Sequence, residues 1–160
     1  MIKILTFLMF FLPLSIFAQK ASKDNVIYSF RTKNGKTMTL SLDETKKQLV
    51  YRYGKASKIE LEFPNEKLEE SLKQFTYSFY MRGGGKENAA MDMNHLSFVN
   101  KDYKYIIYDE TAEGKRMVGI IEINQDTKKR TKSIGIVRSV RGSLIDFRTN
   151  KLVKIEEESF

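Results

Sequence analysis

Cysteine and tryptophan are absent from this sequence of 160 residues, and histidine occurs only once, as His95. The lack of cysteine excludes a disulfide framework, a thiolate nucleophile, an iron–sulfur cluster and a cysteine-ligated zinc site. A site with three histidine ligands is impossible within one chain, and a serine–histidine triad would have to use His95. The sequence therefore offers few of the side chains on which hydrolases and metalloenzymes depend.

The N-terminal segment has the features of a secretory signal peptide. Lys3 is the only charge in residues 1–18, and it precedes an apolar run from Ile4 to Phe17. This run is shorter than the ~20 residues that span a bilayer, and no cysteine follows it to carry a lipid. We expect cleavage after Ala18, leaving residues 19–160 as one exported domain in a bacterial periplasm or outside the cell, with at most peripheral membrane association.

Alternating apolar residues dominate the sequence from Val26 onward, and turn residues interrupt them about every ten positions. This pattern predicts an all-β fold: a single-domain antiparallel barrel or sandwich of about ten short strands. The pair Asn34-Gly35 is a strong hairpin signal. Asn65, after Pro64, would cap one short helix over 66–73. The expected strands are 26–30, 38–42, 49–53, 59–63, 75–82, 95–100, 103–108, 117–124, 133–138 and 143–148, with 151–155 as a further candidate.

Two sets of aromatic and apolar residues follow from this alternation. One set would point inward, and its complete packing would argue against a ligand cavity. Its members are Tyr28, Phe30, Leu40, Leu49, Phe75, Tyr77 and Phe79. The other set consists of tyrosines, which exceed the needs of one core and suit an interface or local hydrogen bonds at the rim. They are Tyr51, Tyr53, Tyr77, Tyr80, Tyr103, Tyr105 and Tyr108.

Positive charge is concentrated near the C-terminus of a chain whose formal net charge is +8. If these cations share a surface, they would attract an anionic partner, such as an acidic protein or a lipid headgroup. The alternative is a solvated hairpin tip with scattered surface cations. Nucleic acid is disfavoured by export and by the lack of interleaved aromatic residues. The basic residues are Lys128, Lys129, Arg130, Lys132, Arg138, Arg141, Arg148, Lys151 and Lys154.

The glycine run Gly83, Gly84 and Gly85 predicts an exposed loop after an aromatic strand. No Gly-Lys-Ser/Thr sequence closes a phosphate-binding loop here, and a strand rather than a helix follows. We expect a partner-binding loop that includes the neighbouring Tyr80 and Arg82. The candidate partner-binding residues are therefore Tyr80, Arg82, Gly83, Gly84, Gly85, Lys128, Lys129, Arg130 and Lys132.

Met91, Met93 and His95 occupy alternate positions, so on a strand they would share one face. Thioether and imidazole ligands suit Cu(I), and the pattern resembles the Met/His sites of small periplasmic copper-binding barrels. It lacks the tryptophan that some of those sites use. The alternative is that the methionines belong to a core and that His95 is a surface or hydrogen-bonded residue.

No residue pattern indicates catalysis. Glu60 and Glu62 would share the outer face of one strand, where solvent is the default, and no Gly-X-Ser-X-Gly elbow is present. The sequence thus predicts no enzyme and no cofactor. It favours an exported domain that binds an anionic or acidic macromolecule through strand-face tyrosines, hairpin loops and a basic C-terminal face.

The first predicted hairpin, from Tyr28 through Asn34-Gly35 to Leu42, resembles the start of the membrane-bound or periplasmic lysozyme-inhibitor barrels. That resemblance implies an antiparallel barrel that inserts a loop into the cleft of a hydrolase. The cysteines and the Ser-Gly loop of those proteins are missing, and a basic inhibitor would repel a basic lysozyme. An inhibitor or immunity-type protein against a hydrolase or toxin, and a carrier of a small ligand or metal, stay open as alternatives.

Overall fold

The computed structural model describes residues 25–43, 47–65, 71–86 and 88–156. The predicted signal peptide and residues 66–70 of the predicted helix lie outside these ranges. The strands are β1 (Asn25–Arg31), β2 (Thr37–Asp43), β3 (Gln48–Lys55), β4 (Lys58–Phe63), β5 (Thr76–Arg82), β6 (Met91–Asn100), β7 (Tyr103–Ala112), β8 (Lys115–Asn124), β9 (Arg130–Ile134), β10 (Arg141–Gly142) and β11 (Lys154–Ile155). The helices are the 3₁₀ helices η1 (Ser71–Gln74) and η2 (Val137–Ser139) and the α-helix α1 (Phe147–Asn150).

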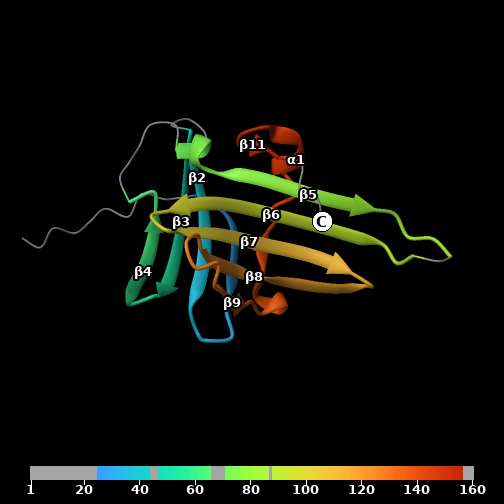
Figure 1. Ribbon diagram of the computed structural model, residues 1–160, viewed down its shortest axis with the longest axis horizontal. Coiled ribbons are helices and arrows are strands. Elements are labelled where there is room, and N and C mark those ends of the chain that lie inside the picture. The colour runs from blue at the N-terminus through green and yellow to red at the C-terminus, as the bar shows by residue number, and fades with distance from the viewer. Residues whose placement is uncertain (1–24, 44–46, 66–70, 87, 157–160) are drawn as a thin grey trace, which may run out of the picture.

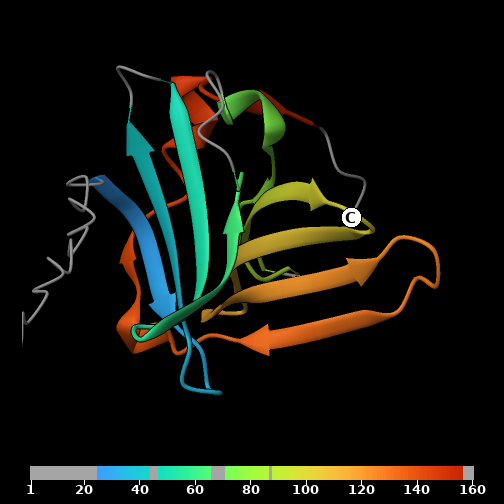
Figure 2. The ribbon, with the colours of Figure 1, turned by 90° about the vertical axis from the view of Figure 1, so that its left-hand side faces the viewer.

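These strands form two sheets that pack face to face, as Figures 1 and 2 show. The first sheet has the order β10-β1-β2-β3-β4, and the second has the order β11-β5-β6-β7-β8-β9. Within the described ranges neither sheet closes into a barrel. The predicted all-β class is confirmed, and of its two forms the sandwich fits. One pair departs from the antiparallel prediction, because β11 runs parallel to β5.

The first hairpin forms where Asn34-Gly35 predicts it. Gly35 adopts a positive φ of 81°, which a residue without a Cβ accepts at little cost. The side-chain oxygen of Asn34 accepts hydrogen bonds from the Thr32 hydroxyl and from the Lys36 backbone N–H. Local turn chemistry therefore sets the register of β1 and β2, in which Phe30 faces Met38.

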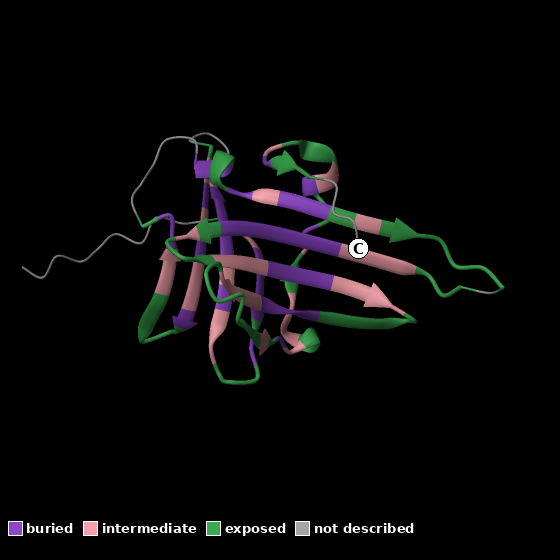
Figure 3. Ribbon diagram, viewed as in Figure 1, coloured by how far each residue is buried: buried purple, intermediate pink, exposed green. Residues whose placement is uncertain are grey.

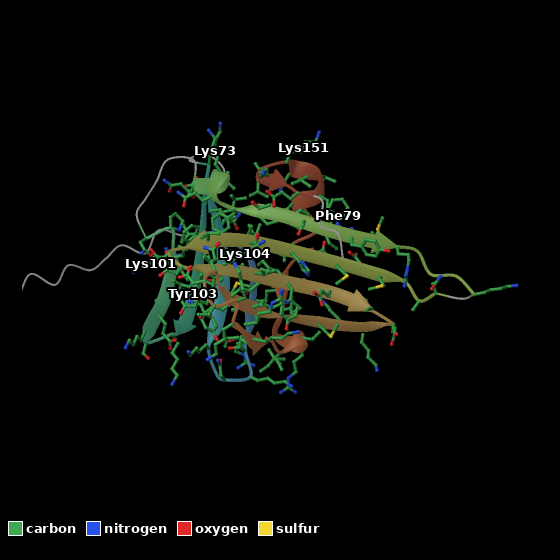
Figure 4. The ribbon with its side chains drawn as sticks, viewed as in Figure 1. Lys73, Phe79, Lys101, Tyr103, Lys104 and Lys151 are labelled. Atoms are coloured by element: carbon green, nitrogen blue, oxygen red, sulfur yellow. The ribbon has the colours of Figure 1, made fainter. Side chains whose placement is uncertain are left out.

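The core lies between the two sheets and is strongly aromatic. The rings of Phe63 and Phe98 stack with their centroids 4.3 Å apart, and Phe98 stacks on Tyr105 at 5.0 Å. Six members of the predicted inward set are buried, namely Tyr28, Phe30, Leu40, Leu49, Phe75 and Tyr77. Phe79 is the exception, with 37 % of its surface exposed, because the far ends of β5 to β8 extend past the first sheet (Figures 3 and 4).

Two predicted strands near the C-terminus are wrong. The strand expected over 133–138 ends at Ile134, since Gly135 crosses toward the first sheet, where its backbone bridges to Thr32. The strand expected over 143–148 is replaced by the turn that leads into α1. There Leu144 and Phe147 are both buried, and their spacing of three suits a helical turn rather than a strand.

The C-terminal segment contacts both sheets. β10 pairs with β1 through Tyr28 and Ser29, and β11 pairs with β5 through Thr76 and Tyr77. The last described residues thus provide one edge strand of each sheet.

Candidate functional site

A cleft of about 560 Å³ opens where β9 ends and η2 begins, and we call it the basic cleft. It arises because β8 pairs with β9 only from Gly119 to Ile123, which leaves the beginning of β8 without a strand partner on that side. The lining residues are Lys33, Tyr108, Arg116, Met117, Val118, Lys132, Ile134, Gly135, Ile136, Val137 and Arg138.

Backbone contacts fix the wall of the basic cleft that follows β9. The Gly135 N–H donates to the Val118 carbonyl at 2.8 Å, and the Ile136 N–H donates to the Arg31 carbonyl at 2.7 Å. A Cβ on Gly135 would lie 2.6 Å from the Val118 side chain and 2.9 Å from the Phe30 ring. Only glycine fits at this crossing between the sheets.

Tyr108 and Lys132 form another part of the cleft. Tyr108 lies over Gly119, where an added Cβ would be 2.3 Å from the phenol oxygen. The Lys132 ammonium sits 4.6 Å from the centroid of the Tyr108 ring, within range of a cation–π interaction. Burial, with the nearby Glu110 charge, raises the pKa of Tyr108 to about 12, so the phenol is neutral at ordinary pH.

The cleft is lined by four cations and by no carboxylate. Arg116 is held by Asp109, which accepts hydrogen bonds at 2.8 Å and 2.6 Å and also accepts one from the Tyr28 hydroxyl at 2.9 Å. The other three, Lys33, Lys132 and Arg138, form no ion pair with a described residue. Their unbalanced charges give the cleft a positive potential beside apolar Met117, Ile134 and Val137.

The predicted basic segment is divided among several places. Lys132 and Arg138 line the basic cleft, whereas Lys128 and Lys129 belong to the β8–β9 turn, and Arg130 begins β9. Arg141 lies in β10 at the edge of the first sheet. Lys151 follows α1 (Figure 4), and Lys154 lies in β11 and pairs with Glu156 at 2.7 Å.

Arg148 is occupied in a polar network between α1 and the second sheet. Its guanidinium donates to the Asn94 side-chain oxygen at 2.7 Å and to the Tyr77 hydroxyl at 3.3 Å, and it forms an ion pair with Asp92. It also lies 4.9 Å from the centroid of the Phe79 ring. These contacts make Arg148 a structural residue rather than part of a basic surface.

The glycine loop lies away from the basic cleft, beyond the end of β5 (Figure 1). The Arg82 guanidinium donates to the Ala89 carbonyl at 3.2 Å, and Gly85 N–H donates to the Asn88 carbonyl at 2.8 Å. Neither Gly83 nor Gly85 has a heavy atom within 4 Å of where a Cβ would be. The loop is open, and Tyr80 at its base lies on β5.

Met91, Met93 and His95 occupy alternate positions of β6, which begins at Met91 rather than at His95, where the expected strand begins. Their imidazole is already engaged, since His95 Nε2 lies 2.7 Å from a Glu110 carboxylate oxygen. The Met91 sulfur accepts a hydrogen bond from Arg82 at 3.2 Å. Among the described residues no group of three His, Cys, Asp or Glu side chains is placed to hold a metal ion.

For several residues of the basic cleft, no sequence pattern indicates that they belong to a binding site. Lys33 enters it from the first hairpin turn, and Arg116 enters from the beginning of β8. They reach Arg138 only because Gly135 carries the chain from one sheet to the other. The Lys33-Asn34-Gly35-Lys36 turn predicts an exposed cation, but not what it faces.

Comparison with protein-family models, with curated proteins and with solved structures finds no match for this chain. The part of the chain that the structure describes holds no helix with the length and apolar character needed to cross a bilayer.

Proposed function

We propose that this protein is an exported, non-enzymatic binding domain whose basic cleft receives an acidic segment of a partner protein. The charge of the cleft carries the proposal, because four cations line it without a carboxylate. Apolar Met117, Ile134 and Val137 line the same cleft. A segment that combines acidic and aliphatic side chains would complement both features.

The parts of the cleft agree with the kinds of recognition element expected from the sequence. Lys33 comes from a hairpin turn, Tyr108 is a tyrosine on a strand face, and Lys132 and Arg138 belong to the basic C-terminal segment. The cations of the β8–β9 turn would add long-range attraction rather than contact.

The proposal is tested with a labelled octapeptide that alternates glutamate with leucine, followed by fluorescence anisotropy. The triple variant Lys33→Glu, Lys132→Glu and Arg138→Glu should raise the Kd at least about tenfold, because three attractive charges become repulsive. Raising NaCl from about 0.05 M to about 0.5 M should weaken binding to the unaltered protein. A peptide with lysine in place of glutamate should not bind.

The matched control is Lys128→Glu, Lys129→Glu and Arg130→Glu, which makes the same change in net charge at the adjacent turn. This control should retain most of the affinity. An equal loss in both triple variants would show that net charge alone attracts the peptide, and would overturn the assignment of the cleft.

Export is the second part of the proposal and rests on residues 1–18. In a bacterial host, the mature protein should be recovered from the periplasm or the medium with Gln19 as its N-terminus. N-terminal sequencing of the fractionated protein checks this expectation, and an intact Met1 in the cytosolic fraction would contradict it.

A further inference from the structure

A second cleft, of about 400 Å³, lies between the two sheets, and we propose that it binds a small organic ammonium ion. Its lining residues differ from those of the basic cleft throughout. The residues that carry the inference are three tyrosines, two glutamates and a lysine. They are Tyr51, Tyr53, Tyr105, Glu60, Glu122 and Lys36.

Strand alternation separates the two clefts. Lys132 and Ile134 of β9 line the basic cleft, whereas Thr131 and Ser133 of the same strand line the second one. Successive side chains of a strand point to opposite faces, so one short strand serves both. We call the second space the tyrosine cleft.

Tyr51 gives the tyrosine cleft an unused hydrogen-bonding group. Its side chain is fully buried, and its hydroxyl is the one buried side-chain polar atom of the described residues that lacks a hydrogen-bond partner. Burial raises the pKa of Tyr51, and the Glu122 carboxylate adds to the rise. Tyr51 lines the cleft together with Tyr53, Tyr105 and Glu122. A ligand N–H that reached the Tyr51 hydroxyl oxygen would supply the hydrogen bond that it lacks.

The charges of the tyrosine cleft favour a cation. The Lys36 ammonium pairs with Glu60 at 2.5 Å and lies 5.3 Å from the centroid of the Tyr53 ring. The chain thus already places one ammonium group between a carboxylate and a tyrosine here. Glu122 forms no ion pair with a described residue, so it leaves a negative charge in the cleft.

The walls of the cleft are built from packed aromatic rings and suit a compact ligand. The ring of Tyr51 packs on Phe98 with centroids 4.9 Å apart, and Tyr105 stacks on the same phenylalanine. Leu61 and Ile120 add apolar surface. A flat or aliphatic body would lie against these groups, while its ammonium would bind Glu122 and the electron-rich tyrosine rings. A carboxylate ligand would be repelled by Glu122.

Benzylammonium is the probe for this inference, and benzyl alcohol and benzoate are its neutral and anionic counterparts. Each is titrated into the exported domain by calorimetry and followed by amide NMR. We expect only benzylammonium to bind and to shift the amides of Thr131 and Ser133, which line the cleft. Equal binding of benzyl alcohol, or no binding of benzylammonium, would overturn the inference.

Two variants assign the binding groups. Glu122→Gln should weaken benzylammonium binding at least about tenfold, and Tyr51→Phe should weaken it a few-fold. Tyr51→Phe removes only an unpartnered hydroxyl, so the fold should persist, as circular dichroism would verify. The control Glu62→Gln lies outside the cleft, where Glu62 pairs with Arg52. If this control weakens binding as much as Glu122→Gln, general charge rather than the cleft explains the binding.

Discussion

Tyr108 owes its buried position to the glycine that it covers. The phenol lies across β8 at Gly119, and 2 % of the Tyr108 surface is exposed although this face of the sheet has no second sheet packed on it. Lys132 then covers the ring from the neighbouring strand. The absence of a Cβ at Gly119 therefore allows the Tyr108 ring to form a wall of the basic cleft.

Gly119→Ala should destabilise the domain by about 1–3 kcal/mol, as forced overpacking commonly does. The new Cβ would lie 2.3 Å from the Tyr108 hydroxyl and 2.5 Å from the Ser133 carbonyl oxygen, which belongs to the backbone and cannot move freely. Urea unfolding measures the change. Gly85→Ala is the control, because its Cβ would meet no atom within 4 Å. Equal stability of the two variants would refute this account of Tyr108.

The element α1 is short, and its place depends on contacts rather than on helix propensity. A helix of four residues cannot persist alone in water. Phe147 is buried in the core, and Arg148 joins α1 to β5 and β6 through Tyr77, Asp92 and Asn94. Phe147 and Arg148 thus dock α1, and the buried Leu144 and Val153 hold the chain on either side of it.

Arg148→Ala should lower the free energy of unfolding by about 1–3 kcal/mol, because it leaves Asp92 and Asn94 without their shared donor. Asp92 is partly exposed, which keeps the loss below that of a fully buried pair. Chemical denaturation measures the effect, and Asp92→Asn combined with Arg148→Ala should cost less than the sum of the two single changes. Lys154→Ala removes an exposed ion pair and should change stability by no more than about 0.5 kcal/mol.

Strands and turns that depend on residues close together in the sequence can be predicted from the sequence. The strands around Asn34-Gly35 follow from alternation and turn residues, and so does the turn between β6 and β7. However, β6 begins at Met91 and β7 ends at Ala112, each four residues beyond the bound expected from the sequence. β9 and α1 do not follow from such local patterns, because Gly135 and Phe147 take their conformations from packing against Phe30, Val118 and the core. The same holds for the candidate site: its cations can be counted in the sequence, but their convergence depends on the crossing at Gly135.

At the scale of the whole molecule, buried tyrosine side chains make the free energy of unfolding depend on pH in the alkaline range. Burial is the first cause that raises the pKa values of five of them, and they lie in both sheets: Tyr28, Tyr51, Tyr77, Tyr105 and Tyr108. The folded state holds these phenolic protons more tightly than the unfolded chain does. Unfolding is therefore favoured once the pH rises past the ordinary tyrosine pKa of about 10.

We expect the free energy of unfolding to be constant with respect to these groups below about pH 9 and to fall as the pH rises from about 10. The contribution of Tyr108 should be lost between the pKa of an unfolded tyrosine and its own value of about 12. Urea unfolding at successive pH values gives the slope, and Tyr108→Phe should make it shallower. Tyr103→Phe, at a more exposed tyrosine, is the matched control. A stability that rises above pH 10 would contradict the direction of these shifts.

Each sheet takes an edge strand from residues 141–155, which follow all the other described strands in the chain. β10 is an edge strand of the first sheet, and β11 is an edge strand of the second. The Arg31 backbone N–H donates to the side-chain hydroxyl of Ser139, 108 residues later in the chain. Contacts of such long sequence separation form slowly, because a large loop has to close first. We therefore expect these edge contacts to form after the hairpins within each sheet, which join strands that are neighbours in the sequence.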